Sequence, residues 1–247
     1  MIVSYRHFEQ FEGTDHEFPQ FIRSFILANS CRRIAEVGAG ANPAIPQGFA
    51  SAHGLEYLAV DVDPEELAKA DLPDHVVFDL CRSESEIPGA PFDLIFSVAT
   101  AEHFSDAELA YRNIFDSLVP GGFCVQAFPC LYALPFLVNR LLPHQASGLL
   151  LKLVSPRDSY RRPKFEAYYD RCRGPVRGQI EFLNRVGFKI LEYRTYFGHG
   201  YYERRLKLLH ALEHLKTRML VRMPVPHLVS CATIILQRPS SPSRNQR

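Results

Sequence analysis

The sequence lacks the signals that would place a chain of 247 residues in a membrane-spanning or metal-binding class. None of its six cysteines belongs to a CxxC pair, and no His/Cys cluster has zinc-ligand spacing. The N-terminal residues contain no apolar core of a secretory signal. The longest apolar run, near Cys130 to Val138, is shorter than the ~20 residues that cross a bilayer as a helix. We therefore expect reduced thiols and a cytoplasmic protein without a transmembrane segment.

Composition favours one folded domain. The chain is 47% hydrophobic and 22% charged, which suits a single sizeable core. Its net charge of +1 hides a division, because residues 1–130 hold 7 Lys/Arg and 20 Asp/Glu, whereas residues 131–247 hold 21 and 7. Two interpretations stay open: the basic half faces an anionic partner, or the two halves attract each other.

Apolar strands alternate with helical patterns along most of the chain, which predicts an α/β fold with helices on both faces of a sheet. Strands are expected at 33–37, 56–60, 75–79, 92–98, 123–128, 188–197 and 228–236. Helices are expected within 5–30 and at 64–70, 106–118, 179–186 and 203–222, the last being basic and amphipathic.

The prolines and aromatic residues of 129–178 interrupt this alternation. We predict a single domain over 1–240. It comprises a helical segment (1–30), a ligand-binding core (31–128), a lid insertion after the fifth strand (129–178) and residues that complete the sheet (179–238). We expect a disordered tail at 239–247.

A glycine turn follows the first predicted strand. Gly38 and Gly40 lack side chains, so a ligand can lie against the main chain, and Glu36 is placed to orient the turn or a ligand's ammonium group. Asp61 ends the second strand, where a ribose-binding acid lies in open α/β sheets. Asp79 ends the third and is a candidate acceptor for an adenine amino group. Other residues at the same strand ends are expected to line this site: Asn42, Val62, Leu80, Val98 and Ala99.

The segment Glu36-Val-Gly-Ala-Gly-Ala-Asn42 resembles the E-x-G-x-G-x-G signature of class I methyltransferases, and the chain is similar to their type 11 group. Asp61 and Leu118-Val-Pro-Gly-Gly122 fall in the family's order and spacing. The resemblance implies a Rossmann-like seven-stranded sheet of order 3-2-1-4-5-7-6, with the last strand antiparallel. It also implies S-adenosyl-L-methionine as cofactor and methyl transfer as the activity. Asn42 replaces the usual third glycine, and asparagine tolerates a left-handed backbone better than most residues.

The rival cofactor is a nicotinamide dinucleotide. Its G-x-G-x-x-G turn would need glycine at Pro43, and the Tyr160–Lys164 pair that imitates a dehydrogenase motif contains Pro163, which disrupts the helix such a pair requires. This favours the methyltransferase interpretation.

Glu102 and His103 follow the fourth strand, where the acceptor would enter. The pair resembles that of ubiquinone-pathway O-methyltransferases, but Ala99 replaces the first acid of their E-x-x-E-H pattern, so we predict no metal. His103 is the candidate general base, and Glu102 a candidate acceptor-binding residue. Alternatively, the pair caps the following turn and shapes the cofactor pocket.

The lid supplies further candidates for binding the acceptor. Tyr160, Tyr168 and Tyr169 are expected to enclose it, and Arg161 to bind an anionic group. The alternative is that these side chains only pack the lid onto the sheet. The sequence therefore predicts O- or N-methylation of a small-molecule, glycan or lipid-linked acceptor, with peripheral membrane contact through the apolar stretch Leu131 to Val154 as one option. A non-catalytic cofactor-binding protein stays open, and a nucleic-acid methyltransferase is disfavoured because no base-methylation motif is present.

Overall fold

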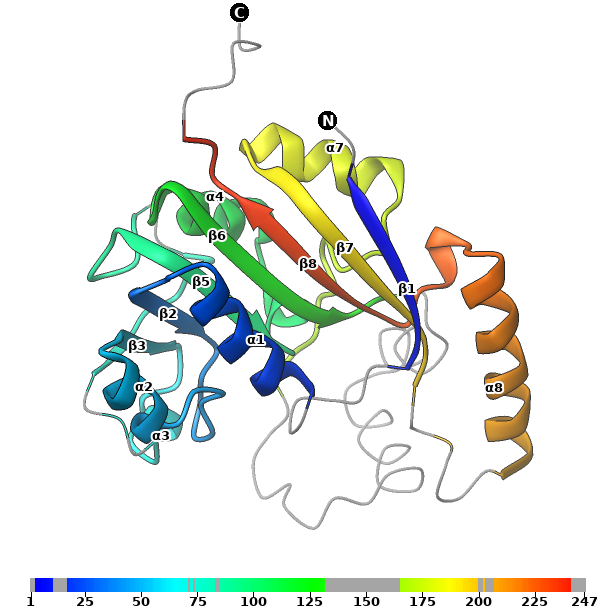
Figure 1. Cartoon of the computed structure of the whole chain (residues 1–247), viewed down its shortest axis with the longest axis horizontal. Coiled ribbons are helices and arrows are strands. Elements are labelled where there is room, and N and C mark those ends of the chain that lie inside the picture. Colours follow the sequence, from blue (N-terminus) through cyan, green and yellow to red (C-terminus); the bar gives the residue numbers. More distant parts are fainter. Residues whose placement is uncertain are drawn as a thin grey trace, which may run out of the picture.

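The chain forms one mixed sheet of eight strands with helices against both faces (Figure 1). The structure, a computed structural model, describes residues 3–10, 17–70, 72, 74–82, 85–131, 165–199, 202 and 207–240. The strands are β1 (Ser4–Gln10), β2 (Arg33–Val37), β3 (Glu56–Asp61), β4 (His75–Val77), β5 (Phe92–Val98), β6 (Leu118–Pro129), β7 (Lys189–Gly198) and β8 (Cys231–Gln237). The α-helices are α1 (Glu17–Ala28), α2 (Gln47–His53), α3 (Pro64–Leu67), α4 (Ala107–Asp116), α7 (Arg177–Val186) and α8 (Lys207–Arg222), and the short 3-10 helices are η1 (Ala101–His103) and η3 (Pro226–Leu228).

The sheet order β4-β3-β2-β5-β6-β8-β7-β1 confirms the predicted arrangement and adds one strand at its edge. β8 runs antiparallel to both β6 and β7, whereas the other neighbouring pairs are parallel. β5 lies near the middle and is apolar along most of its length, as a strand covered on both faces should be.

The prediction of a helix throughout residues 5–30 is wrong for its first part. Residues 4–10 form β1, which pairs with β7 in parallel, and only Glu17–Ala28 is helical. Cross-strand contacts stabilise this pairing: the Phe8 ring stacks on Tyr196 with centroids 5.1 Å apart, and His7 Nδ1 lies 2.7 Å from Thr195 Oγ1. The open edge of β7 thus overrides the helical spacing of Phe8 and Phe11.

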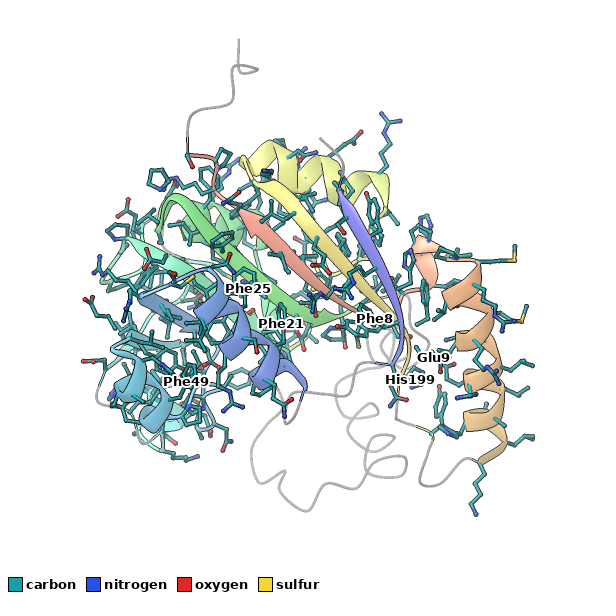
Figure 2. All side chains as sticks on the ribbon, viewed as in Figure 1. Phe8, Glu9, Phe21, Phe25, Phe49 and His199 are labelled. Atoms are coloured by element: carbon teal, nitrogen blue, oxygen red, sulfur yellow. The ribbon has the colours of Figure 1, made fainter. Side chains whose placement is uncertain are left out.

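Two hydrophobic cores cover the two faces of the sheet. On one face α1 packs through Phe18, Ile22 and Ile26, together with side chains from α2 and α3. Phe21 and Phe25 also project from α1 (Figure 2), and the Phe25 ring meets Phe123 of β6 edge to face at 5.3 Å. On the other face α4 and α7 pack together against the sheet. Helices therefore hold the sheet from both sides and fix the strand ends that form the site.

Several predicted boundaries are confirmed by local signals. α7 ends where predicted because Gly187 adopts φ 115°, which a residue with a side chain rarely adopts. Asp106 caps α4 through a 2.9 Å bond from the Leu109 N–H. The α2 helix was not expected from the sequence. Residues 132–164, which hold most of the predicted lid, lie outside the described residues, as does most of the predicted tail.

Candidate cofactor and acceptor site

The predicted cofactor residues gather at one edge of the sheet. Gly38 follows β2, Asp61 ends β3 and Ala99 follows β5, and these strands are parallel neighbours in the order β3-β2-β5. The carboxyl ends of parallel strands meet at a single edge, which is where open α/β sheets bind their ligands. The structure therefore brings together residues that are 61 positions apart in the sequence, from Gly38 to Ala99.

Asp61 organises the glycine turn. Its Oδ2 accepts a hydrogen bond from the Gly40 N–H at 2.9 Å, and its Oδ1 accepts one from the Asp63 N–H at the same distance. The Gly38 N–H donates to the Val60 carbonyl oxygen at 2.7 Å. Asp61, which the sequence predicts to bind the ribose, is thus held in place by its hydrogen bonds to the glycine turn and to Asp63.

Gly38 is required by its neighbour Thr100. Its φ is +73°, and a Cβ built on it would lie 2.2 Å from Thr100 Oγ1. Thr100 Oγ1 itself donates to the Val98 carbonyl oxygen at 3.1 Å, which holds the side chain in this position. The expectation that a bare Gly38 leaves room for ligand is therefore only part of its role, since the loop after β5 fills the space on that side.

Gly40 has φ +53°, and its added Cβ would meet only Asp61 Oδ2, at 3.8 Å. Asn42 is exposed and has no positive φ, so the left-handed backbone lies at the two glycines, and the special tolerance of asparagine is not needed. The open space beside Gly40 and the adjacent carboxylate suit a ligand that carries hydroxyl groups.

Glu36 faces the loop rather than open space. Its buried carboxylate accepts bonds from the Ala44 N–H at 3.0 Å and from the Tyr57 hydroxyl. Burial raises the pKa of Glu36 to about 7, although these two hydrogen bonds oppose the rise. Of the two roles that the sequence left open, the structure favours orientation of the turn.

The other predicted cofactor residues lie around this edge in different settings. Asp79 Oδ1 accepts from the Cys81 N–H at 2.9 Å, and Ala99 has φ 52° with its N–H donating to the Ala127 carbonyl at 2.8 Å. Leu80 is buried in the core, with its carbonyl oxygen held by Asn113 at 2.9 Å. Val62 is exposed and Val98 half-buried. Their contact with a cofactor stays a prediction.

The predicted acceptor side forms where residues 165–173 fold against η1. The Glu102 carbonyl oxygen accepts from the N–H groups of Tyr168 and Tyr169, at 2.8 and 2.9 Å. Tyr168 is half-buried, whereas the Tyr169 side chain is buried in the core. Glu102, His103, Tyr168 and Tyr169 are thus brought together, and Tyr160 and Arg161 lie outside the described residues.

The His103 ring is held in one orientation. Its Nδ1 lies 2.8 Å from the carbonyl oxygen of Glu166, which can only accept, so Nδ1 carries the proton. In the neutral ring Nε2 is then the unprotonated nitrogen, and it lies 3.9 Å from Glu102 Oε1. This tautomer is the one that a general base acting through Nε2 requires.

Glu102 is a buried carboxyl group close to the buried Cys130 and Cys172 and the half-buried Cys231. Its Oε2 has no hydrogen-bond partner, and burial raises its pKa from 4.5 to about 8. Burial likewise raises the pKa of the thiols of Cys130 and Cys172, and that of Cys231 to about 12. All six cysteines are unpaired. Within the described residues no group of three or more His, Cys, Asp or Glu side chains is placed to hold a metal ion.

Titration of Glu102 should make the stability of the fold depend on pH. Because its folded pKa is raised, its contribution to the free energy of unfolding is complete below pH 4.5 and is lost as the pH rises toward 8. Glu102→Gln keeps the shape of the side chain and removes the charge. We expect the variant to be more stable than the parent by roughly 3–5 kcal/mol at about pH 9 and nearly equal at about pH 5.

Urea unfolding across this pH range measures the effect. The exposed Glu65→Gln variant is the control and should follow the parent at every pH. If the free energies of unfolding of the parent and of Glu102→Gln change with pH in parallel, Glu102 is not a buried acid.

A shallow hollow lies beyond the segment that contacts η1. Its lining includes Arg171, Arg173 and Asp170, whose Oδ1 lies 3.7 Å from Arg171 Nε. Gln179 also lines the hollow, and its side-chain amide is buried and has no hydrogen-bond partner. Its lining residues Asp170 and Arg171 directly follow Tyr169 in the chain, and none of the predicted cofactor residues lines it. Arg171 and Arg173, which belong to the basic half of the sequence, therefore lie a few residues after Tyr168 and Tyr169.

Sequence reasoning missed Thr100 and Tyr57. Thr100 contacts Gly38 through a fold that joins residues 62 positions apart, so no local pattern reveals it. For Tyr57 a signal existed: it shares a face of β3 with Ala59 and Asp61, because side chains alternate along a strand.

Comparisons with known proteins agree with this geometry. Residues 35–126 match a family model described as a methyltransferase domain. No curated protein matches the chain. A solved S-adenosylmethionine-dependent methyltransferase from Mesorhizobium loti is 17% identical with a TM-score of 0.53, and the alignment covers 92% of this chain and 100% of that one.

Two further solved structures share the fold. Phosphoethanolamine N-methyltransferase 2 from Haemonchus contortus, in complex with S-adenosyl-L-methionine, is 17% identical with a TM-score of 0.50; the alignment covers 84% of this chain but 49% of that one. The [4+2]-cyclase SpnF is 15% identical with a TM-score of 0.51, and the alignment covers 96% and 87%. Together with the family match and the strand order, these likenesses confirm the predicted fold. Residues 35–126 are therefore similar to the methyltransferase-domain family, and the chain has the fold of the solved S-adenosylmethionine-dependent methyltransferases that it resembles.

Proposed function

We propose that this protein transfers a methyl group from S-adenosyl-L-methionine to an oxygen or nitrogen of a small-molecule, glycan or lipid-linked acceptor. One observation carries the proposal: the glycine turn bound to Asp61 and the oriented His103 follow neighbouring strands at the same edge of the sheet. This arrangement supports a methyl-donor site beside a group that can accept a proton.

The donor fits the residues present. Asp61 offers a carboxylate to ribose hydroxyls, the backbone around Gly40 is open, and Asp79 lies beyond the end of the neighbouring strand β4. When bound, S-adenosylmethionine supplies a methyl carbon that is activated by its sulfonium sulfur. The protein's tasks are to align the acceptor, to exclude water and to accept a proton.

His103 is suited to the last of these tasks. With Nδ1 donating to the Glu166 carbonyl, Nε2 takes the proton of an acceptor hydroxyl or amine. Burial favours the neutral form of Glu102, so this residue places no full negative charge beside the His103 ring. The lining of the hollow holds two arginines, Arg171 and Arg173, against one acid, Asp170, and this excess of positive charge supports an acceptor that carries an anionic group.

A second function is a cofactor-binding protein of this fold that does not transfer the methyl group. The likeness to SpnF favours it, because a protein named as a [4+2]-cyclase has the same fold. The fold alone therefore does not establish methyl transfer, and the two functions must be separated by experiment.

Calorimetry and label transfer test the proposal together. We expect S-adenosylmethionine and its demethylated product to bind with micromolar affinity, and label from the methyl group to appear in a small-molecule or lipid fraction of cell extract. His103→Ala should keep the binding affinity within about threefold and lower the transfer rate by roughly 10²–10⁴-fold, the usual contribution of a general base.

His53→Ala, which removes an exposed histidine at the end of α2, is the matched control and should behave as the parent does. Binding without transfer into any fraction would establish the second function. If neither ligand gives heat in calorimetry, both proposed functions are excluded. If His103→Ala transfers the methyl group at the full rate, only the role of His103 as general base is excluded.

A further inference from the structure

Helix α8 lies at the edge of the molecule (Figure 1). Its large exposed hydrophobic side chains form a continuous apolar stripe. Five large side chains of the stripe are between 57% and 79% exposed: Leu208, Leu212, Leu215, Met219 and Met223. They are spaced by three or four residues, so they lie on one side of the helix, and the Met223 N–H continues the helical bonding to the Met219 carbonyl oxygen. Exposed apolar side chains in a continuous stripe mark an interaction surface, whereas single ones do not.

The opposite side of α8 attaches the helix to the protein. Thr217 and Leu220 are buried there, and the helix contacts β1 and β7. Glu213 Oε1 lies 3.3 Å from His199 Nε2 and 2.5 Å from Lys216 Nζ. Glu9 and His199 lie beside this side of α8 in Figure 2. The helix is therefore fixed with its apolar stripe directed outward.

The charges along α8 are of one sign on its exposed surface. Lys207, Arg218 and Arg222 are exposed along the same helix as the stripe. Glu213 is the single acid in the α8 sequence, and it lies on the attached side with only 13% of its side chain exposed. An apolar stripe that is accompanied by cations and lacks acids complements an anionic lipid surface.

Two other partners for the apolar stripe of α8 match its exposed cations less well. A second copy of the chain docked by the same stripe would bring cations toward cations with no exposed acid on α8 to neutralise them. Residues 132–164 of the chain itself, outside the described part, contain six Lys/Arg and one Asp, so they offer no complementary charge. Within the described residues no helix is long and apolar enough to cross a membrane.

We propose that α8 lies flat on an anionic bilayer, with the apolar stripe at the boundary of the acyl chains and the cations among the phosphate groups. This inference extends beyond methyl transfer, because it rests on α8 alone. It places the protein at the surface on which a lipid-linked acceptor would be found.

A fluorescence experiment tests the contact directly. The chain contains no tryptophan, so Leu215→Trp introduces a single reporter into the stripe. We expect its emission to shift to shorter wavelength with phosphatidylglycerol vesicles at low salt, to shift far less with phosphatidylcholine vesicles, and to return toward its original position in about 0.5 M salt. Leu27→Trp, at the end of α1 where the parent leucine is 52% exposed, should show no shift.

Vesicle sedimentation with charge variants provides the second measurement. Leu212→Glu with Leu215→Glu should lower binding at least tenfold without lowering the unfolding midpoint, because both side chains are exposed. Arg218→Gln with Arg222→Gln should lower binding to phosphatidylglycerol vesicles.

Absence of a fluorescence shift would overturn the proposal. So would a dimer that the Leu212→Glu and Leu215→Glu changes dissociate, without vesicle binding. Calorimetry with the methyl donor, measured on the same variants, keeps this failure separate from a failure of the proposed function.

Discussion

Gly38→Ala should lower the affinity for S-adenosylmethionine by at least about 100-fold, close to 3 kcal/mol of binding free energy. The added Cβ would lie 2.2 Å from Thr100 Oγ1 and 2.4 Å from its Cγ2, so either the glycine turn or the loop after β5 must move. The φ of +73° adds roughly 1–2 kcal/mol of strain for a residue with a side chain. Calorimetry with the methyl donor measures the loss.

Two variants separate this effect from general damage. Gly48→Ala introduces the same methyl group where no atom lies within 4 Å, and it should bind as the parent does. Thr100→Gly in the Gly38→Ala background removes the clashing atoms and should recover at least tenfold of the affinity, with the backbone strain remaining. If the double variant binds no better than Gly38→Ala, the contact with Thr100 does not explain the need for glycine.

Asp61→Ala should also lower the cofactor affinity by at least about 100-fold. The substitution removes the carboxylate expected to bind the ribose, and it leaves the N–H groups of Gly40 and Asp63 without their acceptor. Hydrogen bonds to a charged group contribute roughly 1.5–3 kcal/mol each, and here the turn and the ligand depend on the same side chain. Titration calorimetry measures the affinity, and thermal unfolding reports whether the fold is intact.

Asp63→Ala, two residues away, is the matched control. Asp63 Oδ1 caps α3 by accepting from the N–H groups of Glu65 and Glu66, so its loss should cost about 1 kcal/mol of stability and leave the affinity within threefold. Equal loss of affinity in both variants would mean that Asp61 acts only by holding the loop.

The parts of the fold that could be predicted from the sequence depend on local signals. The apolar run of Phe92–Val98 is typical of a strand covered on both faces, and Gly187 ends a helix because it lacks a side chain. The pattern from Glu36 to Asp61 predicted two neighbouring strands, and in the structure their ends bring Gly40 and Asp61 into hydrogen-bond contact. These signals lie within a few residues of the features that they specify.

The parts that could not be predicted depend on partners distant in the sequence. The spacing of Phe8 and Phe11 is compatible with a helix. Residues 4–10 nevertheless pair with residues 192–198, because β7 offers an unpaired edge. The packing of Thr100 against Gly38 and the bond from Tyr57 to Glu36 arise in the same way. The acceptor is equally beyond local pattern, because the residues expected to surround it come from several segments.

The position of β8 between β6 and β7 has a consequence for synthesis of the protein. A nascent chain that has emerged only as far as residue 198 can pair β2 to β6 but has no neighbour through which β7 and β1 can join them. The ribosome must expose residues 231–237 before that half of the sheet can assemble. Until then β1, although made first, and β7 can form only a parallel pair that is not attached to the rest of the sheet, and we expect a chaperone to shield its apolar side chains.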